Sequence, residues 1–264
     1  MGEKLVSAWQ QPENRWAELP NSIHNDAVAT RIGMRGGTIP GTVHLNHFVP
    51  LIQSTFGSRW YQRGTISMFY TFATTHREKV RAVMDPPSGA ENERLDALVE
   101  TPEGKIVAKG SISVGSPAGA DYVASLPLED APRDELRILQ DLLVGEEAPP
   151  KDNVVITEGG GSGDEAGILI YPAAMYGALN VGFPPGKIRQ PSVGFFGATE
   201  IRLLDGPVRL NTGYRRTGKV VCVGASPKTE FAWVDSALLD ERGKTIAEMR
   251  HLTRWMKSSS DLWS

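Results

Sequence analysis

Two short segments near the start of the chain hold residues whose types and spacing could do chemistry. The first is Asn21-Ser22-Ile23-His24, in which an imidazole follows an amide side chain by three positions. The second is the glycine-rich turn Gly36-Gly37-Thr38-Ile39-Pro40-Gly41. An imidazole changes charge near neutral pH, and free backbone N–H groups stabilise developing negative charge. Together the two segments predict a small cavity for proton transfer beside a developing oxyanion.

Each residue of these segments has a chemical interpretation and a structural one. His24 is the candidate general acid and base, although a lone histidine is more often structural. Asn21 either holds a substrate or caps a turn through its side chain. Gly41 and Thr42 begin the helix expected after Pro40, where N–H groups lack an intrahelical acceptor and the helix dipole favours negative charge. We expect these two to face a substrate carbonyl, unless the proline merely starts a helix.

Two further histidines lie three residues apart in the same expected helix. The spacing of His44 and His47 places them near one helix face, where they could line the cavity or bind a metal ion. No third ligand stands at a recognisable spacing, so we expect neither a metal ion nor another cofactor. His44 is the better placed of the two for the cavity, and it is the candidate catalytic partner of His24.

Aromatic residues from both halves of the chain could line an apolar substrate channel. Tyr70 and Tyr176 are the candidates for contact with the substrate. Packing in a core explains such residues equally well, because large aromatic side chains dominate protein cores. The other large side chains considered for the channel are Trp60, Tyr61, Met68, Phe69, Tyr171 and Met175.

Composition sets broad limits on the class of protein. The 264 residues, of which 40% are hydrophobic, suffice for one large or two smaller cores. A formal net charge of −3 gives no reason to expect nucleic acid or an anionic membrane as partner. Cys222 is the only cysteine, which excludes an internal disulfide and a CxxC metal site. The first eleven residues lack the apolar run of a signal peptide and no run is long enough to span a membrane, so we expect a soluble cytoplasmic protein.

The stretch from Glu158 to Gly167 is rich in glycine and acidic residues. It lacks the Gly-Lys-Ser/Thr end of a phosphate-binding loop, so it does not indicate nucleotide binding. We expect a surface loop there.

A repeated strand-and-hairpin pattern divides the chain into two halves. One expected strand begins at Lys79 and is followed by a hairpin that turns at Gly104. A second begins at Lys219 and is followed by a hairpin that turns at Gly243. Nearly the same number of residues separates the two strand starts and the two turns. The constant offset predicts duplication of one β-rich unit.

Each half also has an apolar helical segment ahead of its strands. The first covers Val43 to Thr55 and the second covers Ile168 to Val181. A helix followed by an antiparallel sheet that packs on it, repeated twice, is an α+β architecture. We therefore expect an N-terminal domain over residues 1–147, which holds the candidate site, and a C-terminal domain over residues 148–264. The segment between them, 146–151, is acidic and rich in proline.

The glycine turn and the histidine resemble a known family. Asn21-Ser22-Ile23-His24, followed by Gly33, Gly36-Gly37 and Pro40-Gly41, is similar to the signature of the MaoC-like hydratases and dehydratases. That signature is Asp-x-Asn-Pro-(aliphatic)-His, with a glycine-rich turn leading into a central helix. The resemblance covers mainly residues 16–75. It implies a double hotdog fold, in which two antiparallel sheets each wrap around a central helix, with one half keeping the chemistry and the other keeping the shape.

The chain departs from the family at one important position. In the family an aspartate and the histidine handle the water and the proton that are added to an enoyl thioester or removed from it. Leu19 stands where that aspartate is expected, and Ser22 replaces the usual proline. A leucine can do neither task. Glu18 lies one residue away and would point to the opposite face of an extended segment unless the backbone bulges, while Asp26 could orient the histidine.

Two classes of function remain open at this stage. The resemblance implies a hydro-lyase that adds or eliminates water at an α,β-unsaturated acyl compound, for which a thioester such as acyl-CoA fits best. Leu19 favours the alternative, a hotdog protein that binds an acyl or other apolar ligand without hydratase activity, or one that acts on a non-thioester substrate. A thioesterase is a weaker third choice. In each case we expect a small-molecule partner and a monomer or homodimer.

Overall fold

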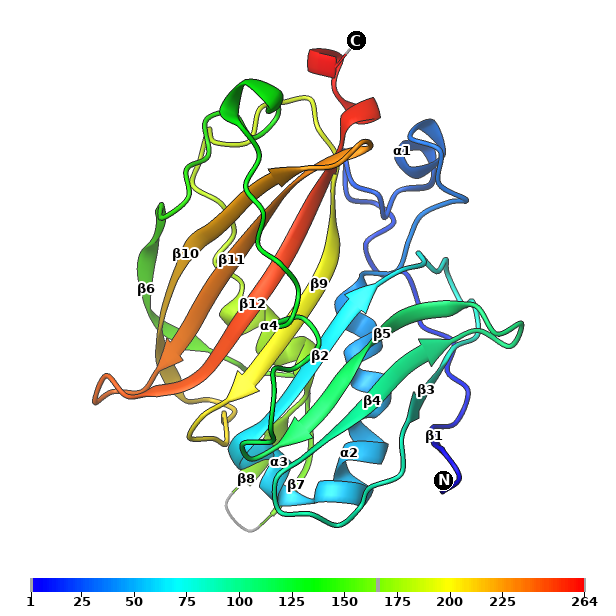
Figure 1. Cartoon of the computed structure of the whole chain (residues 1–264), viewed down its shortest axis with the longest axis vertical. Helices are drawn as coiled ribbons and strands as arrows, with labels where there is room; N and C mark the ends of the chain where they lie inside the picture. Colours follow the sequence, from blue (N-terminus) through cyan, green and yellow to red (C-terminus); the bar gives the residue numbers. More distant parts are fainter. Residues whose placement is uncertain (1, 165–166, 264) are drawn as a thin grey trace.

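The computed structural model describes residues 2–164 and 167–263. Within them, ten strands form one antiparallel sheet in the order β1-β3-β4-β5-β2-β9-β12-β11-β10-β6 (Figure 1). The first five strands of that order come from the N-terminal half: β1 (Leu5–Val6), β3 (Arg81–Met84), β4 (Glu93–Glu100), β5 (Ile106–Val114) and β2 (Gly64–Tyr70). The other five come from the C-terminal half: β9 (Gly194–Leu203), β12 (Thr245–Met256), β11 (Thr229–Leu239), β10 (Gly213–Ala225) and β6 (Glu147–Val155).

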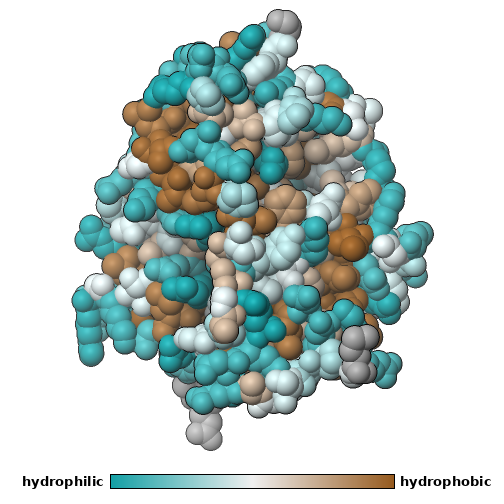
Figure 2. All heavy atoms as spheres, in the orientation of Figure 1, coloured by the Kyte–Doolittle hydropathy of each residue, from teal (hydrophilic) through white to brown (hydrophobic). Residues whose placement is uncertain are grey.

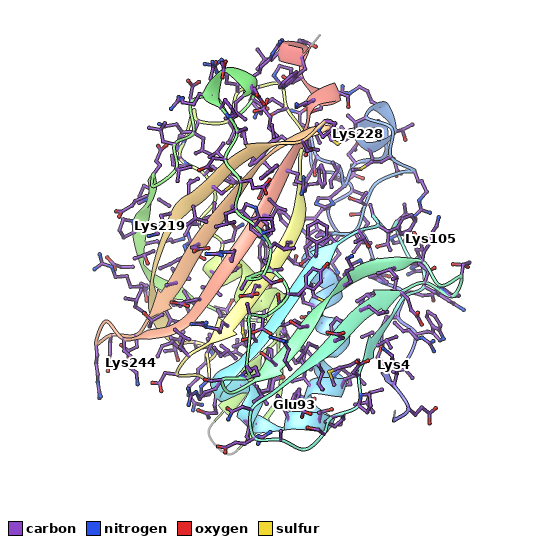
Figure 3. The ribbon with its side chains drawn as sticks, in the orientation of Figure 1. Lys4, Glu93, Lys105, Lys219, Lys228 and Lys244 are labelled. Carbon is purple, nitrogen blue, oxygen red and sulfur yellow. The ribbon has the colours of Figure 1, made fainter. Side chains whose placement is uncertain are left out.

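The two halves repeat one arrangement of strands. The order β3-β4-β5-β2 in the first half corresponds to β10-β11-β12-β9 in the second, and β2 pairs with β9 at the centre. Figure 3 shows Lys105, in the turn after β4, and Lys244, in the turn after β11, on opposite sides of the molecule. The predicted α+β class and the repeat of a strand followed by a hairpin are therefore confirmed.

The helices pack on one face of the sheet. In the first half η1 (Gly41–Phe48), α2 (Val49–Phe56) and α3 (Ser58–Arg63) follow one another almost without a break, and in the second half α4 (Pro172–Leu179) takes the same role. Figure 1 shows these helices behind the strands. Buried side chains from them and from the sheet form the largest apolar cluster, which includes Phe48, Ile52, Trp60, Met175 and Leu179.

The second helix is shorter than the sequence predicted. The expected helix over 168–181 is helical only from Pro172 to Leu179, because residues 167–170 form strand β8 (Gly167–Ile170), which pairs with β7 (Gly160–Asp164). Proline at the first helical position starts the helix, since its fixed φ suits that position and its missing N–H has no partner there. The hairpin also replaces much of the surface loop expected over 158–167, of which residues 165–166 lie outside the described residues.

The proline-rich segment 146–151 is mostly a strand. It enters β6, which pairs with β10 alone and so forms one edge of the sheet. An edge strand tolerates proline because one side of its backbone has no ladder to complete. The proposed boundary at residue 147 coincides with the first residue of this strand.

The connection between the halves is the long segment from residue 115 to residue 146. It crosses the face of the sheet opposite the helices, where Val123 packs against Ala198, Trp233 and Leu252 (Figure 1). On this face, hydrophobic atoms form patches separated by hydrophilic ones (Figure 2). No helix in the described part of the chain is both long enough and apolar enough to cross a membrane.

A buried carboxylate anchors the end of this connection to the sheet. Glu230, on β11, is fully buried, and its oxygens accept hydrogen bonds from the backbone N–H groups of Arg137, Ile138 and Leu139. The indole N–H of Trp263 donates a fourth, at 2.7 Å. Four donors compensate the carboxylate for the water it loses on burial.

Glu230→Gln will test this anchor. The glutamine side chain has an NH2 group in place of one carboxylate oxygen, and this group cannot accept a hydrogen bond. At least one of the N–H donors therefore loses its acceptor. We expect the free energy of unfolding to fall by about 3 kcal/mol, measured by urea denaturation. Glu241→Gln, at an exposed position of the β11–β12 turn, is the matched control. Equal stabilities of the two variants would contradict the assignment.

Candidate active site

A cavity of about 250 Å³ lies where the two halves meet. Its walls come from the segment before η1, the end of β2 and the start of β9, and β2 and β9 are neighbouring strands at the centre of the sheet (Figure 1). Four of the predicted site residues line it: His24, Gly41, His44 and Tyr70. Apolar side chains make up much of the remaining wall, among them Met34, Ile39, Phe72, Phe195 and Phe196.

The imidazole of His24 is held in one orientation at this cavity. Its Nδ1 lies 2.7 Å from the carbonyl oxygen of Thr38. A carbonyl oxygen can only accept, so Nδ1 carries the proton and donates it. The other ring nitrogen, Nε2, has no hydrogen-bond partner among the described residues. In the neutral imidazole Nε2 therefore keeps a free lone pair, as a general base requires.

The glycine turn brings Thr38 to the histidine by close contact of two backbone segments. A Cβ on Gly37 would collide with the carbonyl oxygen of His24, so only glycine fits at this position. The backbone N–H of Thr38 donates to the carbonyl of Ile23 at 2.9 Å, and the amide of Asn14 donates to the carbonyl of His24 at 2.8 Å. The turn that the sequence singled out thus fixes the imidazole.

The two residues after His24, Asn25 and Asp26, form hydrogen bonds to backbone N–H groups. Asn25 caps α1 (Asp26–Arg31), accepting hydrogen bonds from the N–H groups of the first turn. The carboxylate of Asp26 accepts from the backbone N–H of Gly37 at 2.6 Å. Asp26 therefore stabilises the backbone of the glycine turn.

Burial keeps the His24 imidazole neutral near pH 7. Loss of solvent lowers its pKa below the ordinary value of 6.5, and the hydrogen bond to the Thr38 carbonyl opposes that shift in part. A pKa on the low side of neutrality leaves the base form dominant under physiological conditions.

His44 lines the same cavity, yet both of its ring nitrogens are engaged. Nε2 lies 2.9 Å from the hydroxyl of Thr74, and Nδ1 lies 3.2 Å from Nε2 of His47. Burial lowers the pKa of His44 to about 3 and that of His47 to about 4, with the neighbouring His47 contributing to the first shift. His44 is thus a neutral wall residue with no hydrogen bond to His24.

Gly41 and Tyr70 are in van der Waals contact at the cavity. A Cβ on Gly41 would lie 2.7 Å from the aromatic ring of Tyr70, which is closer than such atoms approach. The hydroxyl of Tyr70 donates to the Thr199 hydroxyl at 3.0 Å, and burial raises its pKa. The first N–H groups of η1 have no intrahelical acceptor, so that of Gly41 is available to a ligand in the cavity.

Three predicted site residues lie outside the cavity wall. Asn21 is exposed with φ at +55°, a left-handed conformation typical of asparagine in turns. Thr42 is buried behind Gly41 in the helix. Tyr176, on α4, packs against Phe196 with ring centroids 5.2 Å apart and so lies one layer behind the wall.

No carboxylate replaces the one missing at Leu19. Leu19 itself is 46% exposed, and Glu18 is exposed as well. The wall residues, all within the described ranges, include neither aspartate nor glutamate. The described part of the chain also contains no group of three or more His, Cys, Asp or Glu side chains placed to hold a metal ion.

Sequence reasoning missed the contribution of the C-terminal half to this wall. Phe195 and Phe196 lie at the start of β9, directly after Gly194, and they reach the cavity because β9 pairs with β2. No local motif marks these residues. Only the pairing of two strands far apart in the sequence places them there.

Comparison with known proteins gives matches in structure alone. No protein-family model and no curated protein matches the chain. A putative MaoC domain protein dehydratase from Chloroflexus aurantiacus J-10-fl aligns with a TM-score of 0.63 and 11% identity, over 97% of this chain and 95% of that one. The dehydratase domain of the polyketide PpsC from Mycobacterium tuberculosis aligns with a TM-score of 0.51 and 11% identity, over 96% and 93%. The chain has the double hotdog fold.

A third solved structure with this fold, the pyran synthase domain from module nine of the sorangicin pathway, aligns with a TM-score of 0.50 and 12% identity, over 97% of this chain and 95% of that one. In hotdog terms, η1 to α3 form the central helix of the first half and α4 that of the second. The fold implied by the histidine motif is confirmed. Identities this low show the fold alone.

The buried neutral histidines make the double hotdog sensitive to acid. Burial lowers the pKa of His44, His47 and His251 to about 3, 4 and 3, whereas the unfolded chain protonates them near 6.5. Between these values the unfolded state binds more protons, so stability falls as pH falls through that window.

We expect each of these histidines to remove up to about 1.4 kcal/mol of stability per pH unit below pH 6.5. Urea denaturation at a series of pH values from 7 to 5 will measure the slope. His47→Gln should flatten it. A stability that does not change over this range would contradict the burial of neutral imidazoles.

Proposed function

We propose that this protein is a lyase that adds water to, or eliminates it from, an α,β-unsaturated acyl thioester, with His24 as general acid and base. The observation that carries the proposal is the orientation of His24. Its Nδ1 is fixed by the Thr38 carbonyl, and its Nε2 has no hydrogen-bond partner among the described residues. His24 and Gly41 line the same cavity. A base and an oxyanion donor at one apolar cavity are the parts that this reaction needs.

The proposed elimination begins at a 3-hydroxyacyl thioester. Nε2 of His24 takes a proton from the carbon next to the thioester carbonyl, and the electrons of that C–H bond move onto the carbonyl oxygen. The N–H of Gly41 donates to this oxyanion. The electrons then form the carbon–carbon double bond, the C–O bond of the hydroxyl breaks, and the leaving oxygen takes the proton back from Nε2 as water. Hydration is the reverse.

Without a carboxylate at the cavity, one imidazole performs both proton transfers. This is the difference from the two-residue chemistry that the family resemblance implies. The names of two structural neighbours, a putative MaoC domain dehydratase and a polyketide dehydratase domain, support the reaction class.

The cavity favours a short acyl chain. Its volume of about 250 Å³ is below the range of about 300–1,000 Å³ that is usual for pockets of drug-sized ligands. We propose CoA as the carrier, a monomer or homodimer as the working unit, and the cytoplasm as the compartment.

One observation favours a second candidate. The cavity wall offers no carboxylate, and the residue at the expected aspartate position, Leu19, is exposed. The alternative is a protein that binds an acyl or other apolar ligand without hydratase activity, or one that acts on a non-thioester substrate. Turnover decides between the two candidates.

His24→Ala will test the proposed reaction. With short enoyl-CoA substrates we expect kcat/KM for hydration to fall by about 10²–10⁴-fold, because general acid–base catalysis contributes that much. The loss of enoyl-thioester absorbance measures the rate. Thr30→Ala, at an exposed position of α1, is the control for an unrelated change in the same segment. Absence of turnover in the wild type, together with tight binding of a non-thioester ligand, would establish the alternative.

The dependence of the rate on pH provides a second test. Because neutral His24 is the base in the elimination direction, kcat/KM should rise with pH through the pKa of His24 and then level off. Burial places that pKa below 6.5, so the midpoint of the acid limb should lie below 6.5. A midpoint above 7 would mean that another group acts as the base.

A further inference from the structure

Two buried polar atoms behind the cavity wall have no hydrogen-bond partner among the described residues. They are Nε2 of His251, on β12, and the hydroxyl of Tyr176, on α4. The side chains are 4% and 9% exposed, and their rings lie 5.0 Å apart. Leaving a buried donor or acceptor unpaired costs about 1–3 kcal/mol, so two such atoms on neighbouring rings call for an explanation.

One aromatic residue separates this pair from the cavity. Phe196 lines the cavity, and its ring centroid lies 4.7 Å from that of His251 and 5.2 Å from that of Tyr176. The next residue, Gly197, is skipped in the pairing of β9 with β12, where Ala198 faces Leu252 and Phe196 faces Thr253. A bulge of this kind redirects the neighbouring side chains and is frequent beside binding sites.

A chain of hydrogen bonds also joins the pair to the cavity. Tyr70, in the cavity wall, donates to the hydroxyl of Thr199 at 3.0 Å, and that hydroxyl lies 2.9 Å from Nδ1 of His251. These bonds fix the His251 ring and leave only Nε2 open. The imidazole therefore has one polar atom without a partner among the described residues, and its ring is in contact with that of Tyr176.

The surroundings select a neutral partner. Burial lowers the pKa of His251 to about 3 and raises the pKa of Tyr176, so both side chains are uncharged. An ionic group would lose its hydration here without an opposite charge to replace it. A hydroxyl can donate and accept at once, so it can pair with the tyrosine hydroxyl and with either tautomer of the imidazole.

We propose that the cavity extends past Phe196 to an inner polar subsite, where Nε2 of His251 and the hydroxyl of Tyr176 bind a hydroxyl group carried on the acyl chain of the substrate. This inference rests on the proposed function, and it narrows the substrate to acyl groups that carry a hydroxyl besides the one eliminated at His24. In this proposal the Phe196 ring turns within its side-chain rotamers to open the connection.

The test compares matched acyl-CoA ligands in binding, without turnover. Short saturated acyl-CoA thioesters are titrated into the protein by calorimetry, each without a hydroxyl and with one at each chain carbon in turn except carbon 3, because a 3-hydroxyacyl thioester is the substrate of the proposed elimination. We expect one position to give about tenfold tighter binding than the unsubstituted ligand, as a buried hydrogen bond would.

The variants assign that preference to the subsite. Tyr176→Phe and His251→Leu should each reduce the hydroxyl preference to about onefold, with a smaller effect on the unsubstituted ligand. Tyr122→Phe, on the opposite face of the sheet, should keep the preference. Near-native thermal unfolding of Tyr176→Phe, which removes only one oxygen atom, makes its binding result decisive even if the histidine variant fails to fold.

The possible failures are distinguishable. Binding of the unsubstituted ligands with no preference for a hydroxyl at any position overturns this inference alone and leaves a buried water as the occupant. A preference that survives both variants also overturns it. If no acyl-CoA binds at all, the proposed function fails and the inference fails with it.

Discussion

The pairing of β2 with β9 is the interaction on which the rest of the structure depends. It joins two half-sheets into one, with Thr65 opposite Arg202 at one end and Phe69 opposite Ala198 at the other. Beyond that last pair the chain reaches Tyr70 on one strand and Phe196 on the other, and both enter the wall of the cavity. Neither half contains the cavity by itself. Duplication within one chain therefore matters for the cavity, because it makes this pairing intramolecular and sets its register.

A second constraint acts within the N-terminal half, where the backbone at Gly37 passes against the carbonyl of His24. Only a residue without Cβ permits this approach, and the approach places the Thr38 carbonyl at Nδ1 of the histidine. The tautomer of the imidazole is thus determined by backbone geometry. In many acid–base sites a carboxylate orients the histidine. Here a neutral carbonyl does so, and it raises the pKa of the imidazole less than a carboxylate would.

The local parts of this site could be predicted from the sequence, and the distant parts could not. The histidine motif, the glycine turn and Gly41 are contiguous, so their chemistry and their resemblance to a family pointed to one cavity. The hairpins were predictable because apolar alternation and Gly-Lys turns are local signals. The β7–β8 hairpin and the edge strand β6 were missed, since glycine and proline argue against strands until a pairing partner is known. His251 carried no signal, because its importance comes from two neighbours on other elements.

The charge balance of the cavity bears on how the proposed reaction would proceed without the carboxylate. Elimination next to a thioester places negative charge on the carbonyl oxygen, and a nearby carboxylate would repel that charge in a site of low dielectric constant. The walls here are apolar or neutral, His44 is held neutral, and η1 begins at the cavity wall, where N–H groups without an intrahelical acceptor favour negative charge. In the proposed elimination, no second acid among the described wall residues serves the leaving hydroxyl, so that step would depend on the proton already held by His24. Under the proposed mechanism, such a site would lack a second proton donor but would repel the oxyanion less. A leucine at position 19 together with a histidine at position 24 is consistent with this.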